Sequence, residues 1–210
     1  MQFKKLNSDY AEFGKEMNKN LNIFYKMVSN SNPLHLNKDQ RNTLVELSFL
    51  SCYIAWETFL HKTIIDILLY KHKRTKVSRV EPRDKEHVEK LIKLSAPYPR
   101  FDYSAIIDRE NLFLKVNIYE RVISARRDEL EIMRKIRNMA AHEGITQKEF
   151  YGSVVSHVAP HIILNDAEIL RLPGIFLSCK TRNTNKYFFN YYIDVMDSAA
   201  KEIIRDFNAL

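Results

Sequence analysis

The amino-acid sequence predicts an all-α protein, and three observations lead to this prediction. The 210 residues include only 4 Gly and 6 Pro, which leaves few positions for the tight turns that join short strands. Hydrophobic residues make up 45% of the chain, which is enough for a sizeable core. Apolar residues also recur at helical spacing over most of the sequence. We therefore expect a helical bundle that forms one domain over residues 1–210.

The first expected helix covers residues 8–29, where apolar side chains share one face and Ser8 or Asp9 can cap the start. The Asn30–Pro33 segment is expected to end it. A longer helix follows, from about residue 38 to Tyr70. It is apolar on most of its circumference, which suits the centre of a bundle.

The middle of the chain alternates polar segments with shorter helices. Residues 71–94 are rich in cations, and a short helix is expected from Asp84 onward. This segment is interpreted as a solvated loop, with RNA contact as the alternative. Residues 96–100 break the pattern. Helices are then expected over residues 119–142 and, more briefly, over 147–157.

Near the C-terminus the helical pattern is interrupted once. Residues 170–179 are expected to form a short β-strand or a buried irregular segment, and residues 181–186 a polar turn. A last helix is expected over residues 190–207. The side chains expected along its buried stripe are Tyr192, Met196, Ala199, Ile203 and Phe207.

Charge and cysteine content bear on the partners and the compartment. The net charge of +7 favours an acidic partner such as nucleic acid. Cys52 and Cys179 are too few for a disulfide framework, and Cys52 is expected to be a buried thiol. The N-terminus has no apolar signal core, and charged residues interrupt the apolar run 44–70. We expect a cytoplasmic protein that does not span a membrane.

Several other chemistries are not favoured by the sequence. The histidines have neither the H-E-x-x-H spacing nor a Cys/His pattern of a zinc site, and Pro160 lies between His157 and His161. The glycine-rich signatures of nucleotide and dinucleotide sites and the G-x-S-x-G signature of serine hydrolases are missing. No metal and no cofactor are therefore expected.

The segment from Arg134 to Glu143 carries the most information about function. Taking Arg137 as the origin and roughly 100° per residue, Asn138 falls at about 100° and His142 at about 140°. The apolar residues of the segment fall at about 200° to 320° on the same wheel. The apolar face is thus expected to pack, while Arg137, Asn138 and His142 point away from the core.

Arg137-Asn138, three residues and then His142 resemble the Arg-polar-x-x-x-His motif of the HEPN superfamily, small all-helical proteins of prokaryotic defence, toxin and RNA-processing systems. Residues 48–60 are similar to the apolar helix with an embedded acidic residue that precedes this motif in many members. The resemblance covers roughly Thr43 to Gly144.

This resemblance implies a metal-independent endoribonuclease. A positioned imidazole, here His142, moves a proton while the ribose 2′-hydroxyl attacks phosphorus, and Arg137 stabilises the phosphate charge. The products are a 2′,3′-cyclic phosphate and a 5′-hydroxyl. Asn138 is expected to orient His142 or the phosphate. The resemblance also implies a homodimer, in which two such faces line one cleft.

Supporting roles are assigned to further polar residues. Glu57 is expected to orient Arg137 or Arg134, with an exposed acid or a structural ion pair as the plainer interpretation. Four cations are expected to form a charged helix face, with binding of RNA phosphates as the alternative: Arg126, Arg127, Arg134 and Lys135.

The chain departs from the family at one position. Members silenced by nucleotide transfer have a Tyr two residues after the motif His, whereas this chain has Gly144. Control by AMP transfer to that tyrosine is not implied, and a separate antitoxin or sensor protein is the expected regulator. Anti-phage defence or a toxin–antitoxin system is the setting that the resemblance implies. The alternative is a non-catalytic RNA- or protein-binding helical module that regulates a partner.

Overall fold

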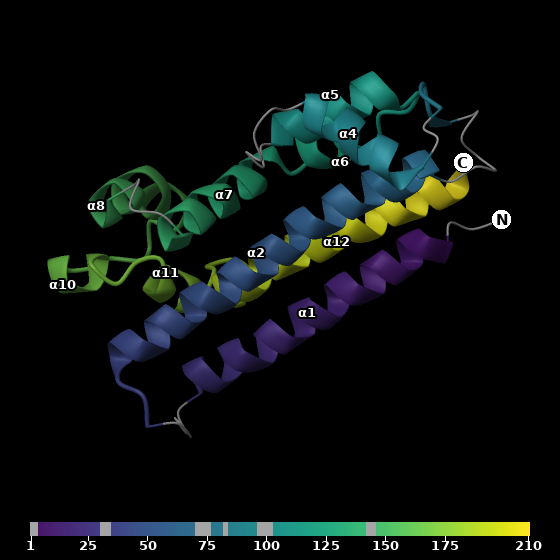
Figure 1. The fold of residues 1–210 in the computed structure, drawn as a ribbon. Coiled ribbons are helices and arrows are strands. Elements are labelled where there is room, and N and C mark those ends of the chain that lie inside the picture. Colours follow the sequence, from purple (N-terminus) through teal and green to yellow (C-terminus); the bar gives the residue numbers. More distant parts are fainter. Residues whose placement is uncertain (1–3, 30–34, 70–76, 82–83, 96–102, 142–145) are drawn as a thin grey trace. The chain divides into compact units, whose positions relative to one another are not determined.

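The computed structural model describes residues 4–29, 35–69, 77–81, 84–95, 103–141 and 146–210, and it shows helices joined by turns (Figure 1). The predicted all-α class is confirmed. Within the described ranges, extended pairing is limited to isolated bridges between Ser78 and Leu114 and between Lys180 and Tyr187. The α-helices are α1 (Lys4–Val28), α2 (Lys38–Leu69), α4 (Lys85–Ser95), α5 (Tyr103–Phe113), α6 (Ile118–Ser124), α7 (Arg127–Ala141), α8 (Gln147–Phe150), α9 (Ser156–Val158), α10 (Asp166–Ile169), α11 (Gly174–Ser178) and α12 (Phe188–Ala209).

The chain divides into two compact units. Unit 1 comprises residues 1–14, 56–127 and 197–210, and unit 2 comprises residues 15–55 and 128–196. The long helices α1, α2 and α12 each contribute residues to both units. The expectation of one domain over residues 1–210 stays a prediction.

Aromatic side chains fill the core of unit 1. Phe13 of α1 packs on Trp56 and Phe59 of α2, with ring centroids 6.0 and 5.3 Å away. Tyr119 of α6 is fully buried, lies 5.5 Å from the ring of Phe207, and shares a 2.7 Å hydrogen bond with the Thr63 hydroxyl. This hydrogen bond satisfies the Tyr119 hydroxyl, which would destabilise the fold if it were buried without a partner.

Unit 2 has its own aromatic core. Phe24 of α1 stacks on Phe189 of α12 at 4.3 Å, and Phe49 of α2 meets Phe189 edge-on at 6.0 Å. Phe176 of α11 stacks on Phe188 of α12 at 4.4 Å. These buried rings account for much of the apolar surface that this unit removes from water.

The long helix α2 agrees with its prediction and begins with a reciprocal cap. The Asn37 side chain accepts from the Gln40 backbone N–H at 2.9 Å, and the Gln40 side chain accepts from the Asn37 N–H at 3.0 Å.

Cys52 of α2 is fully buried, as predicted, and burial raises the pKa of its thiol. By length and composition alone α2 could cross a bilayer, a property that the core helix of a soluble protein shares.

One predicted helix start is wrong, and one predicted helix is divided into two. Helix α1 begins at Lys4, so Ser8 and Asp9 lie inside it and neither caps it. The helix expected over residues 119–142 is broken by a turn at Ala125 and Arg126, where α6 ends and α7 begins. The apolar spacing continues across this turn, and the periodicity therefore gave no sign of it.

The C-terminal third is more helical than predicted. Of the two alternatives expected over residues 170–179, an irregular segment is found at residues 170–173, which form a turn, whereas residues 174–178 form α11 and no strand. Residues 147–158 are helical, as expected, with a π-helical stretch at Tyr151–Val155. The polar turn near residue 181 and the last helix are confirmed, and all five residues of its predicted stripe are buried.

The helix expected from Asp84 is also confirmed as α4, and the Asp84 carboxylate accepts a 2.9 Å hydrogen bond from the His87 backbone N–H. The expected breaks at residues 30–33 and 96–100 lie outside the described residues. Most cations of the polar segment lie outside them as well, namely Lys71, Lys73, Arg74, Lys76 and Arg83.

Candidate functional site

Helix α7 carries the described part of the predicted site. Its first turn contains the acids Asp128 and Glu129, whose charge is favourable at the positive end of the helix dipole. Leu130, Met133 and Ile136 are its buried residues and fix which face packs. The Tyr191 hydroxyl of α12 donates to Glu129 at 3.2 Å. These contacts fix the orientation of α7 about its own axis within unit 2.

Arg137 and Asn138 lie beside each other near the end of α7. A terminal N–H of the Arg137 guanidinium donates to the Asn138 side-chain oxygen at 3.2 Å. Both side chains are half-buried, whereas Leu130, Met133 and Ile136 of the same helix are fully buried. A half-buried guanidinium is less hydrated than an exposed one, and its attraction to an anion is correspondingly stronger.

The third motif residue, His142, lies outside the described residues, and so does Gly144. Helix α7 ends at Ala141, the residue that immediately precedes His142 in the chain. The roles assigned to His142, and to Asn138 as its orienting neighbour, stay predictions.

Glu57 lies on α2 and is half-buried. It belongs to unit 1, whereas Arg137 and Arg134 belong to unit 2. Its supporting role therefore stays a prediction. On the same helix, Glu46 accepts a 2.9 Å hydrogen bond from the Gly174 backbone N–H, and its pKa is raised by burial.

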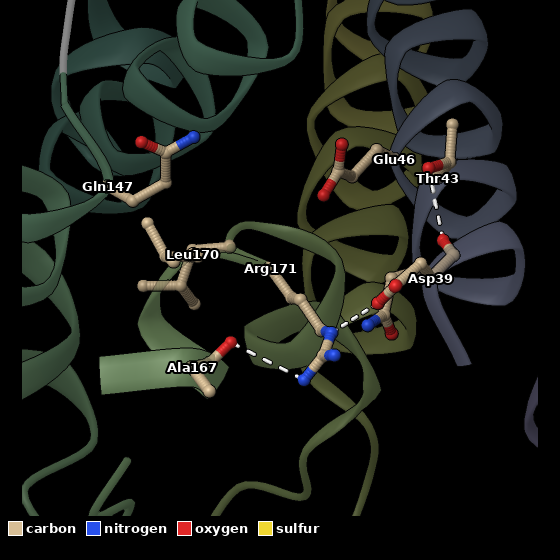
Figure 2. Close-up of a pocket in the computed structure, with 9 residues that line it drawn as sticks. Asp39, Thr43, Glu46, Gln147, Ala167, Leu170 and Arg171 are labelled. Carbon is tan, nitrogen blue, oxygen red and sulfur yellow. Dashed lines mark hydrogen bonds and ion pairs between the residues drawn. The ribbon is translucent and has the colours of Figure 1, made fainter. Parts of the chain in front are cut away.

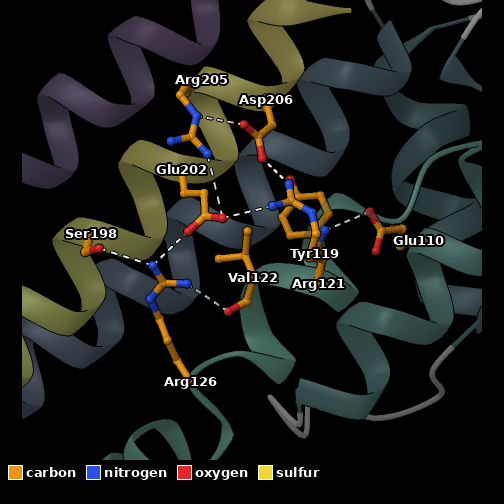
Figure 3. Close-up of polar contacts among 9 residues, drawn as sticks. All are labelled: Glu110, Tyr119, Arg121, Val122, Arg126, Ser198, Glu202, Arg205 and Asp206. Carbon is orange, nitrogen blue, oxygen red and sulfur yellow. Dashed lines mark hydrogen bonds and ion pairs between the residues drawn. The ribbon is translucent and has the colours of Figure 1, made fainter.

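Arg126 takes part in a network within unit 1 (Figure 3). Its guanidinium donates to the Val122 carbonyl at 3.1 Å, to the Ser198 hydroxyl at 3.2 Å and to Glu202 at 2.8 Å. Arg121 also donates to Glu202, at 2.9 Å, and pairs with an aspartate of α12. Arg126 is thus engaged in joining α6 to α12, a role that its charge alone did not reveal.

The remaining three cations proposed for RNA binding differ in their surroundings. Arg134 forms an ion pair with Glu131, one turn earlier on α7. Lys135 is half-buried, and Arg127 is exposed at the start of the helix. Of these residues, Arg127 has the side chain that is most open to a large anionic partner.

Sequence reasoning missed a polar recess in unit 2, with a volume of about 420 Å³ (Figure 2). Glu46 and Gln147 lie on opposite sides of it, and Arg171 reaches across to Asp39. Gly174 allows α11 to lie close to the backbone of Asn42, which borders the recess, because a Cβ at residue 174 would lie 2.5 Å from the Asn42 carbonyl oxygen. The available sequence signal was Gly174, since a glycine within an apolar segment can mark the close approach of another backbone.

Comparison with known proteins adds no assignment: no family model, curated protein or solved structure matches the chain.

Proposed function

We propose that the chain is a metal-independent endoribonuclease in which Arg137, Asn138 and His142 act on the RNA backbone. One observation supports this beyond the motif itself. The Arg137 guanidinium and the Asn138 amide are hydrogen-bonded near the end of α7. Two of the three motif side chains are therefore already together, a few residues before His142 in the chain.

Each residue has a defined task in the proposed reaction. The 2′-oxygen attacks the adjacent phosphorus, the bond to the 5′-oxygen breaks, and His142 transfers a proton. Arg137 binds the phosphate oxygens with paired N–H groups and offsets their growing negative charge. Asn138 holds the plane of the guanidinium through its side-chain oxygen. The products are a 2′,3′-cyclic phosphate and a 5′-hydroxyl.

A second copy of the chain completes the proposed site. In-line displacement is best served by one group that removes a proton from the attacking oxygen and another that protonates the leaving oxygen. One His142 per chain supplies one such group, so a homodimer that brings two of them to one phosphate supplies both. Arg127, Arg134 and Lys135 would steer RNA to this cleft by charge.

The test is cleavage of total RNA in EDTA by purified wild-type protein and by the variants His142→Ala and Arg137→Ala. We expect wild type to cut, and each variant to lose roughly 10²-fold or more in rate, since each removes a proton-transfer or charge-stabilising group. Lys148→Ala, which removes an exposed cation of α8, is the matched control and should cut normally.

Two results contradict the proposal. One is cleavage by His142→Ala at the wild-type rate, and the other is a wild-type protein that never cuts. If that inactive wild type still binds RNA tightly, the chain is the non-catalytic binding module instead.

A further inference from the structure

The polar recess of unit 2 has the size and the walls of a small-molecule site (Figure 2). Its volume of about 420 Å³ lies within the range of roughly 300–1,000 Å³ that is usual for ligand pockets. Two polar side chains point into it from opposite sides, the carboxyl group of Glu46 on α2 and the amide of Gln147 on α8. Ala167 and Leu170, the latter 67% exposed, add apolar surface. A few directed polar groups beside apolar walls suit a small organic ring.

Glu46 is the group of the recess whose polar contacts are least complete. Its side chain is half-buried, and one of its oxygens accepts a 2.9 Å hydrogen bond from the Gly174 backbone N–H. Among the described residues no cation pairs with Glu46, and the nearby Arg171 pairs with Asp39 instead. Burial raises the pKa of Glu46, as expected for a carboxylate whose lost hydration is only partly replaced. A ligand that donates hydrogen bonds to this carboxylate would replace more of it.

Arg171 presents a fixed flat surface at the recess. Its Nε donates to the Asp39 carboxylate of α2, and its Nη1 donates to the Ala167 carbonyl of α10 at 3.4 Å. A guanidinium plane held in this way is a surface on which an unpaired nucleic-acid base can stack. Because Asp39 offsets the charge of Arg171, this surface suits a flat neutral ring better than an anion.

We propose that the recess binds a guanine base, carried either by an RNA strand or by a free guanine nucleotide. The pairing edge of guanine offers two neighbouring N–H groups and the acceptor O6. The Glu46 carboxylate can accept from both N–H groups, and the Gln147 amide can donate to O6. Adenine, cytosine and uracil each offer a carboxylate one donor group at this edge, so they satisfy Glu46 less fully. The guanine ring stacks on Arg171.

The RNA source of the guanine rests on the proposed function, whereas binding of the base does not. Gln147 lies six residues after Ala141, at which α7 ends. Six residues span at most about 22 Å, so Gln147 lies within that distance of the end of α7. In the proposed nuclease the recess therefore holds a guanine near the phosphate that is cut, and it makes cleavage selective for RNA that carries guanine at that place.

The first test is calorimetric titration of the whole chain with four 5′-mononucleotides that share ribose and phosphate and differ in the base. We expect GMP to bind about tenfold more tightly than AMP, CMP or UMP, because these leave acceptor capacity of Glu46 unused. Inosine 5′-monophosphate keeps the ring and O6 of GMP but lacks its 2-amino group. It should bind about tenfold more weakly than GMP.

Two variants and one control assign this binding to the recess. Gln147→Ala removes the amide, and Glu46→Gln keeps the shape of the side chain but removes its charge; each should weaken GMP binding about tenfold. Glu46→Gln should also reduce the preference for GMP over inosine 5′-monophosphate, which a purely structural defect would not do. Asp194→Asn removes an exposed acid of the same unit that does not line the recess, and it should bind GMP as wild type does.

The second test identifies the source of the guanine. A 2′-O-methyl oligouridine, which cannot undergo 2′-hydroxyl attack, is titrated with and without one guanine in the strand. Tighter binding of the strand that contains guanine, lost in Gln147→Ala, assigns the recess to RNA. Equal binding of the two strands, together with selective binding of GMP, assigns it to a free nucleotide.

The proposal is overturned if GMP binds no more tightly than the other mononucleotides, or if inosine 5′-monophosphate binds as tightly as GMP. Unchanged GMP binding in both Glu46→Gln and Gln147→Ala would overturn it as well. Failure of the nuclease proposal would look different. In that case wild type and His142→Ala would both be inactive on RNA, while both still bound GMP selectively.

Discussion

Glu110 shows how one buried carboxylate can replace a helix cap. Asn117, at the start of α6, makes no side-chain capping bond. Instead the Glu110 carboxylate accepts from the backbone N–H groups of Tyr119 at 2.8 Å and Glu120 at 2.7 Å. Glu110 has no exposed surface. Burial raises its pKa to about 7 despite these bonds, because removing the charged form from water outweighs them.

This raised pKa predicts a pH dependence that Glu110→Gln removes. The folded protein keeps the proton until about pH 7, whereas the unfolded chain releases it near the ordinary value of 4.5. The contribution of Glu110 to stability is therefore full below pH 4.5 and is lost as the pH rises through 7. Between pH 4.5 and pH 7 this contribution to the free energy of unfolding falls by about 1.4 kcal/mol per pH unit. Urea unfolding at pH 5 and pH 8 measures it.

Exposed Glu86→Gln is the matched control, since it removes an acid of the same unit from the surface of α4. Asp9 also has a pKa raised to about 7, mainly by burial, so wild type and Glu110→Gln both keep a pH dependence of the same sign from Asp9. The difference in the pH dependence of stability between wild type and Glu110→Gln therefore isolates the contribution of Glu110. An unchanged pH dependence in Glu110→Gln would show that Glu110 titrates normally in the folded protein.

The separate helices α6 and α7 illustrate what periodicity can and cannot predict. Val122, Ile123, Leu130 and Met133 follow helical spacing, so the sequence predicted one helix through all of them. At the turn between them, Arg126 makes tertiary contacts with Ser198 and Glu202, which are distant in sequence and therefore absent from the local pattern. Long apolar helices such as α2 and α12 were predictable, because their many buried positions repeat one pattern.

Arg126 and Arg127 are therefore predicted to differ although they are adjacent. Arg126→Met should lower the free energy of unfolding by about 1–2 kcal/mol, because it leaves a partly buried Glu202 with fewer partners. Arg127→Met should leave stability unchanged and weaken RNA binding with a smaller salt dependence, as expected for one lost phosphate contact. Chemical denaturation and RNA titration over several salt concentrations compare the two.

The reverse pattern would contradict these assignments. If Arg126→Met retained full stability but lost RNA affinity, its bonds to α12 would not hold in solution and Arg126 would belong to the RNA-binding face.

The chain as a complete fold was only partly predictable from its sequence. Composition and periodicity were sufficient for the all-α class, but they carry no information on how long helices distribute their residues between two compact units. The candidate site is proposed from a sequence motif, whereas the bond between Arg137 and Asn138 could not be predicted, since adjacent helical residues do not normally face each other. A pocket of unit 2 is lined by Met27 and Val28, by the first turns of α2, and by Ser178 and Tyr187, and no local sequence pattern predicts contacts between such distant segments.

End-group analysis of RNA fragments made by the purified protein in EDTA tests the nuclease proposal most directly. Attack by the ribose 2′-hydroxyl predicts fragments with 2′,3′-cyclic phosphate and 5′-hydroxyl ends, formed by wild type and not by His142→Ala. Fragments with 3′-hydroxyl and 5′-phosphate ends, or cyclic phosphate formed equally by His142→Ala, would contradict it.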